Sequence, residues 1–342
     1  MDKATYNLGL EYRPLKAVLL RGRYGTAFKA PTLSDQFQGT SGFYQTLTDY
    51  YTCAINGFTG PTLGNCPQAQ QSYFGTTAGN PTLKPITAKV WDVGFVLTPL
   101  ERLSISADYI RWDIDNEVIQ QNAMQLLVTE SQCRLGQLDM TSPTCVAALS
   151  QVSRDSNGVL LSVSTPKINQ SKEKLNVLTI GASYGVNAGP VGDFEFTVSY
   201  SDDLKHEVQR YAGDPLVDVF NDPTLYTDFK SKENASVTWS LADFSSTFYV
   251  EHYGRSPNYL STINGFGTDG AGRLPTWTLC NLSLSYRKWS SLEVTAAVNN
   301  LFNKMPPIDH SYPGIQQQAY NELNYNVFGR TVYLEASYKF HK

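Results

Sequence analysis

Apolar and polar residues alternate one by one along many segments of this chain, a period of two that is typical of β-strands. Phe194, Phe196, Val198 and Tyr200 alternate with polar residues, for example. About eleven such segments occur, and each is near the 9–11 residues that a tilted strand needs to cross a bilayer. They lie near residues 5–12, 16–28, 87–97, 102–114, 174–186, 194–200, 233–241, 244–253, 280–286, 291–302 and 330–340.

The connections between these segments alternate between very short and very long. Tight turns are predicted at 13–16, 98–101, 187–192, 241–243 and 287–290, and long loops near 30–83, 115–170, 202–228, 255–274 and 303–326. Short turns on one rim and long loops on the other are typical of a transmembrane barrel, whereas a β-sandwich shows the same alternation without this asymmetry. Tyrosines before the short turns or the chain end fit an interfacial aromatic belt: Tyr12, Tyr184, Tyr286 and Tyr338.

The predicted fold is therefore all-β: an up-and-down antiparallel transmembrane β-barrel of about eleven strands, with no helix longer than about three turns. The first strand ends in a short turn and so runs towards the periplasm, which places the C-terminus there too. Bacterial single-chain barrels have an even strand number with both ends periplasmic. An odd count that begins outside predicts that strands are missing upstream.

Composition supports a surface that does not face only water. Of 342 residues, 41% are hydrophobic and only 17% charged, with 21 Tyr and 16 Phe; soluble domains average about 25% charged. The net charge of −4 gives nucleic-acid binding no electrostatic support. The sequence has neither an apolar run of about 18 residues nor a secretion signal, which for an exported protein predicts processing or truncation upstream.

Four of the five cysteines form two close pairs inside long loops. Cys53 and Cys66 lie in one loop and Cys133 and Cys145 in the next. The spacing predicts two local disulfides in an oxidising compartment, each limiting the disorder of a loop expected to have almost no apolar core. Cys280 is in phase with Leu282 and Leu284, which predicts a lipid-facing position rather than a redox role.

Four segments resemble those of TonB-dependent receptors, in the family's order and at similar spacing. They are Gly25-Thr26-Ala27-Phe28-Lys29-Ala30-Pro31-Thr32-Leu33, Gly79-Asn80-Pro81-Thr82-Leu83-Lys84-Pro85, Val298-Asn299-Asn300-Leu301-Phe302-Asn303-Lys304, and Gly329-Arg330-Thr331 through Phe340. The resemblance implies that residues 1–342 are the C-terminal half of a 22-stranded receptor barrel, without the plug domain and first barrel strands. The prolines and asparagines in these segments also suit strand ends, so the motifs are interpreted as structural.

The same resemblance implies an outer-membrane receptor of Gram-negative bacteria. It would take up a scarce solute (an iron–siderophore, a cobalamin-like cofactor or an oligosaccharide) with energy from a TonB-type complex that acts through the missing N-terminal part. Its expected partners are outer-membrane lipid and a small-molecule ligand outside the cell. The alternatives are a passive porin-like barrel and a secreted all-β carbohydrate-binding domain.

Candidate chemistry is confined to the loops. Aromatic rings and guanidinium groups there are candidates for stacking on or pairing with a ligand: Tyr44, Tyr50, Tyr51, Arg255, Tyr259, Phe266 and Arg273. The Gly265–Gly270 segment matches G-x-G-x-x-G but lacks the flanking strand and helix of a dinucleotide site. Asp113, Asp115 and Glu117 lack the loop glycine of a calcium site. No catalytic residues, metal ligands or cofactor are predicted.

Overall fold

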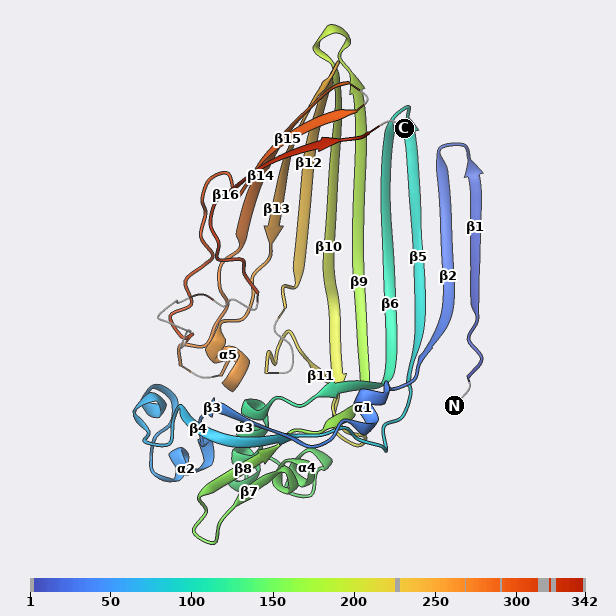
Figure 1. Ribbon diagram of the computed structural model, residues 1–342. Helices are drawn as coiled ribbons and strands as arrows, with labels where there is room; N and C mark the ends of the chain where they lie inside the picture. The colour runs from blue at the N-terminus through green and yellow to red at the C-terminus, as the bar shows by residue number, and fades with distance from the viewer. Residues whose placement is uncertain are drawn as a thin grey trace.

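A curved open sheet of antiparallel strands forms most of the molecule in the computed structural model (Figure 1). The structure describes residues 3–224, 228–267, 269–289, 291–312, 320 and 324–340. Eleven strands follow one another in chain order across this sheet, from β1 at one edge to β16 at the other. They are β1 (Asn7–Leu15), β2 (Val18–Lys29), β5 (Ile86–Leu100), β6 (Leu103–Gln120), β9 (Lys167–Asn187), β10 (Asp193–Gln209), β12 (Ser231–Leu241), β13 (Phe244–Tyr253), β14 (Trp277–Trp289), β15 (Leu292–Asn299) and β16 (Thr331–Tyr338).

The prediction of eleven antiparallel strands in simple up-and-down order is confirmed. Strand lengths differ from those predicted, most of all in the middle of the sheet. β10 continues to Gln209, where the sequence predicts a loop from residue 202. Pairing with β9 continues past the bulge between Asp203 and Lys205, although the apolar alternation has ended. The backbone ladder therefore extends beyond the apolar part of these strands.

The short and long connections lie at opposite ends of the strands (Figure 1). We call the end with the short turns the turn rim and the end with the long connections the loop rim. The turn between β9 and β10 contains the short 3-10 helix η2 (Gly189–Val191). Tyr12, Tyr184 and Tyr338 are exposed and pair next to the short turns, at the turn rim, as an aromatic belt requires.

The polar face of the sheet is concave and carries ion pairs that cross the strands. A cavity of about 740 Å³ on this face is lined by Glu11, Arg21, Arg23, Asp92 and Asp108, among others. The Arg21 guanidinium donates to both carboxylate oxygens of Asp108, at 2.7 and 2.5 Å. Gly94 of β5 lies between the strands of Arg21 and Asp108, and a Cβ on Gly94 would lie 2.0 Å from Asp108 Oδ1. Gly94 therefore leaves the space in which this ion pair forms.

The first two long loops are not irregular, which corrects the sequence analysis. Together they fold into a compact unit, the cap, made of residues 33–77 and 123–164, which lies across the loop rim (Figure 1). Its elements are α1 (Leu33–Phe37), β3 (Ser41–Leu47), α2 (Tyr50–Ile55), η1 (Gly60–Asn65), β4 (Gln71–Thr77), α3 (Ala123–Arg134), α4 (Pro143–Gln151), β7 (Val152–Arg154) and β8 (Leu160–Ser164). At 12 residues α3 is just over three turns long, slightly beyond the expected limit.

A second sheet joins the two halves of the cap, in the order β3-β4-β8-β7. Strand β4 of the first loop pairs in parallel with β8 of the second. An apolar cluster packs against this sheet. The sequence analysis expected loops with almost no apolar core, and this expectation was wrong. The buried members of the cluster are Leu47, Ala123, Leu126, Leu127, Ala148, Val152, Leu160 and Val163. Only Leu47 comes from the first loop, so neither loop has this core alone.

Both predicted cysteine pairs form disulfides within the cap. Cys53 of α2 is bonded to Cys66, which follows η1, and Cys133 of α3 is bonded to Cys145 of α4. Closing loops of this length removes roughly 3 kcal/mol of unfolded-state entropy each in the simple chain model. Cys280 is a free cysteine, half-buried in β14.

The first two family-like segments meet where the cap joins the sheet. Thr32 caps α1, and its backbone N–H donates to the Asp35 carboxylate in return. The Asn80 N–H donates to Asp35 O at 2.8 Å, and a Cβ on Gly79 would lie 2.6 Å from Gln38 N. These contacts give the first two motifs a structural role, as the sequence analysis interprets them.

Smaller elements complete the fold: β11 (Val217–Asp218) pairs with β10, and α5 (Tyr259–Asn264) lies in the connection from β13 to β14. Of the helices that the structure describes, none combines the length and apolarity needed to cross a membrane.

The close approach at Gly94 makes a testable prediction. In the Gly94→Ala variant the new Cβ would also lie 2.6 Å from the Ala107 carbonyl oxygen, so backbone has to move. We expect a loss of about 1–3 kcal/mol in the free energy of unfolding, as for other overpacked sites. Thermal unfolding in detergent measures it. Gly9→Ala is the matched control, because no atom lies within 4 Å of a Cβ there; equal effects of the two substitutions would contradict the prediction.

Candidate functional site

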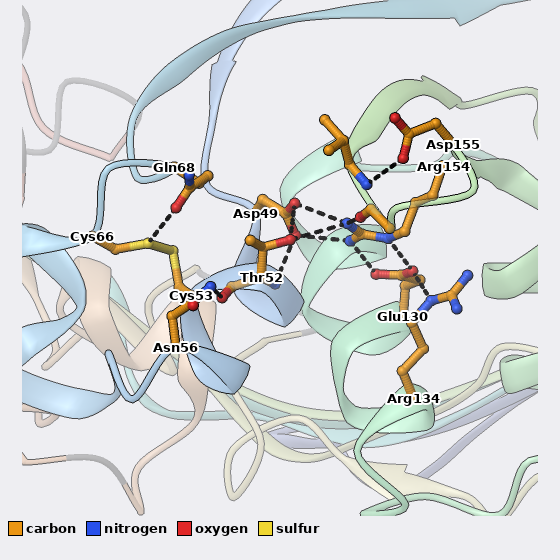
Figure 2. A network of polar contacts seen from close by, with 12 residues as sticks. Asp49, Thr52, Cys53, Asn56, Cys66, Gln68, Glu130, Arg134, Arg154 and Asp155 are labelled. Atoms are coloured by element: carbon orange, nitrogen blue, oxygen red, sulfur yellow. Dashed lines mark hydrogen bonds and ion pairs between the residues drawn. A yellow bond between two sulfur atoms is a disulfide. The ribbon is translucent and has the colours of Figure 1, made fainter.

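One arginine joins the two halves of the cap. Arg154 of β7 donates to both carboxylate oxygens of Asp49 and both of Glu130, each at 2.8 Å (Figure 2). All three side chains are almost fully buried, with exposed fractions of 4%, 2% and 0%. Arg134 of α3 adds a second ion pair to Glu130. The ring of Tyr51 lies within 5.5 Å of both guanidinium groups.

The charges in this network are stabilised by each other. Burial alone raises the pKa of the Asp49 carboxyl, but hydrogen bonds from Arg154 and Thr52 outweigh it, and the pKa is lowered. Burial alone lowers the pKa of Arg154, while its bonds to Glu130 and Asp49 raise it above the ordinary value. The contribution of Asp49 to stability is therefore fully present above the ordinary carboxyl pKa and is lost as the pH falls through the lowered pKa.

Two clefts flank α3, and both include Val128 and Gln132. The first cleft, of about 280 Å³, lies between α3, the segment after β10 and α5. Polar side chains line most of it: Gln125, Thr129, Gln132, Arg210, Asn221, Asp222 and Thr224. We call it the polar cleft.

Arg210 is the charged donor of the polar cleft. Its Nε is buried without a hydrogen-bond partner among the described residues, and its Nη2 donates only a long bond, 3.4 Å, to Gln125. Burial lowers the pKa of Arg210, and the negative charges of Asp222 and Asp214 act in the opposite direction. A guanidinium stays charged under these conditions and has donors to spare. An anionic group of a ligand would satisfy them.

The second cleft, of about 260 Å³, lies between α3 and the α2–η1 segment. Apolar side chains dominate its walls, and we call it the apolar cleft: Tyr50, Ala54, Phe58, Leu63, Val128 and Leu135. Burial raises the pKa of the Tyr50 hydroxyl, and the nearby Tyr259 adds to this effect. The two clefts together offer a charged hydrogen-bonding site beside an apolar one.

The seven predicted ligand residues do not form one site. Tyr50 lines the apolar cleft, and Tyr259 of α5 lies near it while packing on Tyr312. Tyr51 belongs to the Arg154 network. Tyr44 is 76% exposed on β3, and its ring lies against the Phe74 ring.

The other three predicted residues form a separate cluster in the connection between β13 and β14. The Arg273 guanidinium lies 4.6 Å from the centre of the Phe266 ring and donates to Phe220 O. Arg255 donates to the Arg273 backbone oxygen at 3.4 Å. These contacts link the connection between β13 and β14 to Phe220 in the connection between β10 and β12, so we interpret the cluster as a brace between the two connections.

Sequence reasoning missed most of the cleft residues, including Arg210, Gln125, Phe58 and Leu63. The one available signal was the Arg210-Tyr211 pair in the third long loop, a guanidinium beside an aromatic ring. The amides and aliphatic side chains carried no signal, because only the packing of α3 brings them together.

Comparison with known proteins connects this architecture to a family. Residues 2–301 match the family model described as the TonB-dependent receptor-like β-barrel. A mutant of the ferric enterobactin receptor PfeA from Pseudomonas aeruginosa, solved with enterobactin, is 16% identical with a TM-score of 0.60. The siderophore receptor PirA from Acinetobacter baumannii is 15% identical with a TM-score of 0.57. The copper transporter OprC is 13% identical with a TM-score of 0.52.

These alignments cover 98% of this chain, and 40%, 41% and 39% respectively of the solved ones. The chain thus spans about two fifths of the length of the receptors that it resembles, and at these identities the likeness concerns the fold alone. A comparison with curated protein sequences found no match.

Replacing Arg154 tests the network that holds the cap together. Arg154→Met leaves two buried carboxylates without their shared cation, which typically costs about 3–5 kcal/mol. We expect the cap to open to limited proteolysis and to unfold at lower temperature. Arg134→Met is the control: its side chain is 32% exposed and Glu130 would keep Arg154, so a loss of at most about 1 kcal/mol is expected. Equal sensitivity of the two variants would contradict this role of Arg154.

Proposed function

Because the chain belongs to the TonB-dependent receptor family, in its β-barrel domain, we propose that it forms barrel wall and ligand-capture loops of an outer-membrane receptor for energised uptake of a scarce solute. The observation that carries this proposal is the pair of clefts beside α3, at the loop rim of a sheet with a polar concave face. In an outer-membrane barrel the long loops face the cell exterior and the polar face lines the lumen. The clefts then meet a solute before the lumen does.

The chemistry of the clefts narrows the solute class. Arg210 and three amide side chains suit an anionic group with several oxygen acceptors. Phe58, Leu63 and Leu135 in the neighbouring cleft suit an apolar or aromatic part of the same molecule. An anionic iron–siderophore chelate combines both features, whereas a neutral oligosaccharide would offer Arg210 hydroxyl acceptors but no negative charge to pair with. The neighbours' names, ferric enterobactin and siderophore receptors, support the same class.

Residues 1–342 as a whole are proposed to be the C-terminal half of a 22-stranded barrel, whose plug and remaining strands lie on another segment. Support comes from the edges of the sheet. β1 and β16 both run from the loop rim to the turn rim, so direct closure would need a parallel pair between them (Figure 1). An unpaired strand edge exposes backbone groups that lipid cannot satisfy, at several kcal/mol per group. The plug would also carry the contact with the TonB-type complex.

Replacing Arg210 tests the clefts as the capture site. In the assembled receptor we expect Arg210→Ala to weaken binding of an anionic ferric siderophore by about 10- to 100-fold, because a charge-assisted hydrogen bond contributes about 1.5–3 kcal/mol. Arg210→Lys should restore part of the affinity. Arg255→Ala is the control, since Arg255 lies in the separate cluster and lines neither cleft. Unchanged binding by Arg210→Ala would exclude the polar cleft, and uptake that survives a protonophore would indicate a passive pore.

Separate expression tests the proposed half-barrel. We expect the chain alone, exported to the outer membrane, to show neither heat-modifiable gel mobility nor ligand uptake, because both sheet edges lack partners. Co-expression with the N-terminal half of a related receptor barrel should raise the yield of inserted protein. Full insertion and energy-dependent uptake by the chain alone would contradict the proposal.

A further inference from the structure

On the lipid-facing side of the sheet, the side chains change from mostly apolar to mostly charged towards the loop rim. Directly paired residues of an antiparallel sheet lie on the same face, so the pairing register defines rows across neighbouring strands. One row on the outward face carries Val93, Tyr109 and Leu178 on β5, β6 and β9 and ends with Asp202 on β10. The next row towards the loop rim begins with Tyr24 and Trp91, whose ring centres are 4.2 Å apart. Such rings mark the edge of an apolar band.

Charged residues occupy the outward face immediately beyond this boundary, on β5, β6, β9 and β10. The row of Trp91 continues with Arg111, Asn176 and Lys205. The row above it reads Lys89, Asp113, Lys174 and Glu207 across the same four strands. Lys172 follows in the next row, opposite Asp115. We call these five cations and three acids the outer patch.

The outer patch has an excess of positive charge in a chain whose net charge is −4. Two of its cations are paired: Arg111 with Asp113 at 3.0 Å and Lys205 with Glu207 at 2.8 Å. Among the described residues, Lys89, Lys172 and Lys174 form no ion pair. Lys89 and Lys172 are exposed and Lys174 is half-buried. Three ammonium groups are therefore available to an external anion.

The outward face differs on the neighbouring strands. The row of Ile180 and Tyr200, two rows nearer the turn rim than that of Asn176, reaches β12 and β13 with Glu233 and His252 rather than with lysines. A general need for solvation beyond the membrane would be met equally well by acids or amides. The concentration of free lysines beside the band edge on β5 to β10 points to a specific counter-charge.

We propose that the outer patch binds the phosphorylated headgroup of a lipid in the leaflet next to the loop rim. The acyl chains of this lipid would lie along the apolar rows below, and its phosphates would meet Lys89, Lys172 and Lys174. The inference rests on the proposed membrane placement but is independent of the solute. A lipid phosphate is the anion that this position selects, because the patch is continuous with the lipid-facing band. Lysines near an anionic membrane surface each strengthen binding about fivefold.

The test compares two lipids that differ in one phosphate. The assembled barrel that contains this chain is purified in detergent and titrated with diphosphoryl lipid A and with its monophosphoryl form. We expect tighter binding of the diphosphoryl form. In the variant Lys89→Ala/Lys172→Ala/Lys174→Ala this binding should weaken on the order of a hundredfold, and the preference should vanish.

Two further variants separate a specific patch from total charge. Arg13→Ala/Lys16→Ala/Lys339→Ala removes three exposed cations near the turn rim and should bind like the original. Asp113→Asn/Asp115→Asn/Glu207→Gln removes the acids of the patch and should bind more tightly. Lysine variants that bind unchanged, or equal losses in the two cation variants, would overturn the inference. A barrel that stays soluble without detergent would overturn the membrane placement as well, whereas one that needs detergent but binds both lipids equally would overturn only the lipid site.

Discussion

A chain segment inside a lipid bilayer has no water with which to pair its backbone N–H and C=O groups. Everything in the main sheet of this protein follows from that constraint. Each strand pairs with the preceding and following strands of the main sheet. At the turn rim, the short turns make this the pairing with the least loss of chain entropy. The outward face can then be apolar and exposed, as Leu8, Leu10 and Leu334 are, with exposed fractions of 67%, 73% and 78%. In water such a face would aggregate; against lipid it is the stable choice.

The cap obeys the opposite rule, since it lies beyond the apolar band. It has a small buried core, two disulfides and charged groups that are paired by bidentate bonds. A buried ion pair adds little to stability compared with apolar packing, but breaking one is costly. We therefore interpret the role of Arg154 as structural specificity. Its bonds to both carboxylates form when Asp49 of the first loop faces Glu130 of the second (Figure 2). That arrangement fixes α3, and α3 forms a wall of both clefts.

Charge is used differently on the three surfaces of the molecule. On the concave face, arginines and aspartates pair across strands and keep the wall rigid. At the loop rim, Arg210 keeps donors unused beside a cleft. On the outward face, unpaired lysines follow the edge of the apolar band. Only on the concave face are the positive charges paired within the protein. At the loop rim and on the outward face, unpaired donors therefore remain with which an external anion can form hydrogen bonds and ion pairs.

The sequence by itself determined the strand number, their order and the faces of the sheet, because a period of two is a local property that the lipid constraint turns into a fold. The spacing of Cys53 and Cys66, and of Cys133 and Cys145, likewise predicted both disulfides, since each pair closes a short loop. The cap and the clefts were decided only by the tertiary structure. Leu47 packs into the core of the cap, and Asp49 pairs with Arg154 in its ion network. The partners of both residues are more than seventy residues away along the chain, and no local sequence pattern predicts such contacts. For the same reason, the seven aromatic and arginine residues that were predicted from residue type alone do not lie in one site. Arg210 and Gln125 are neighbours only because α3 packs against the segment after β10.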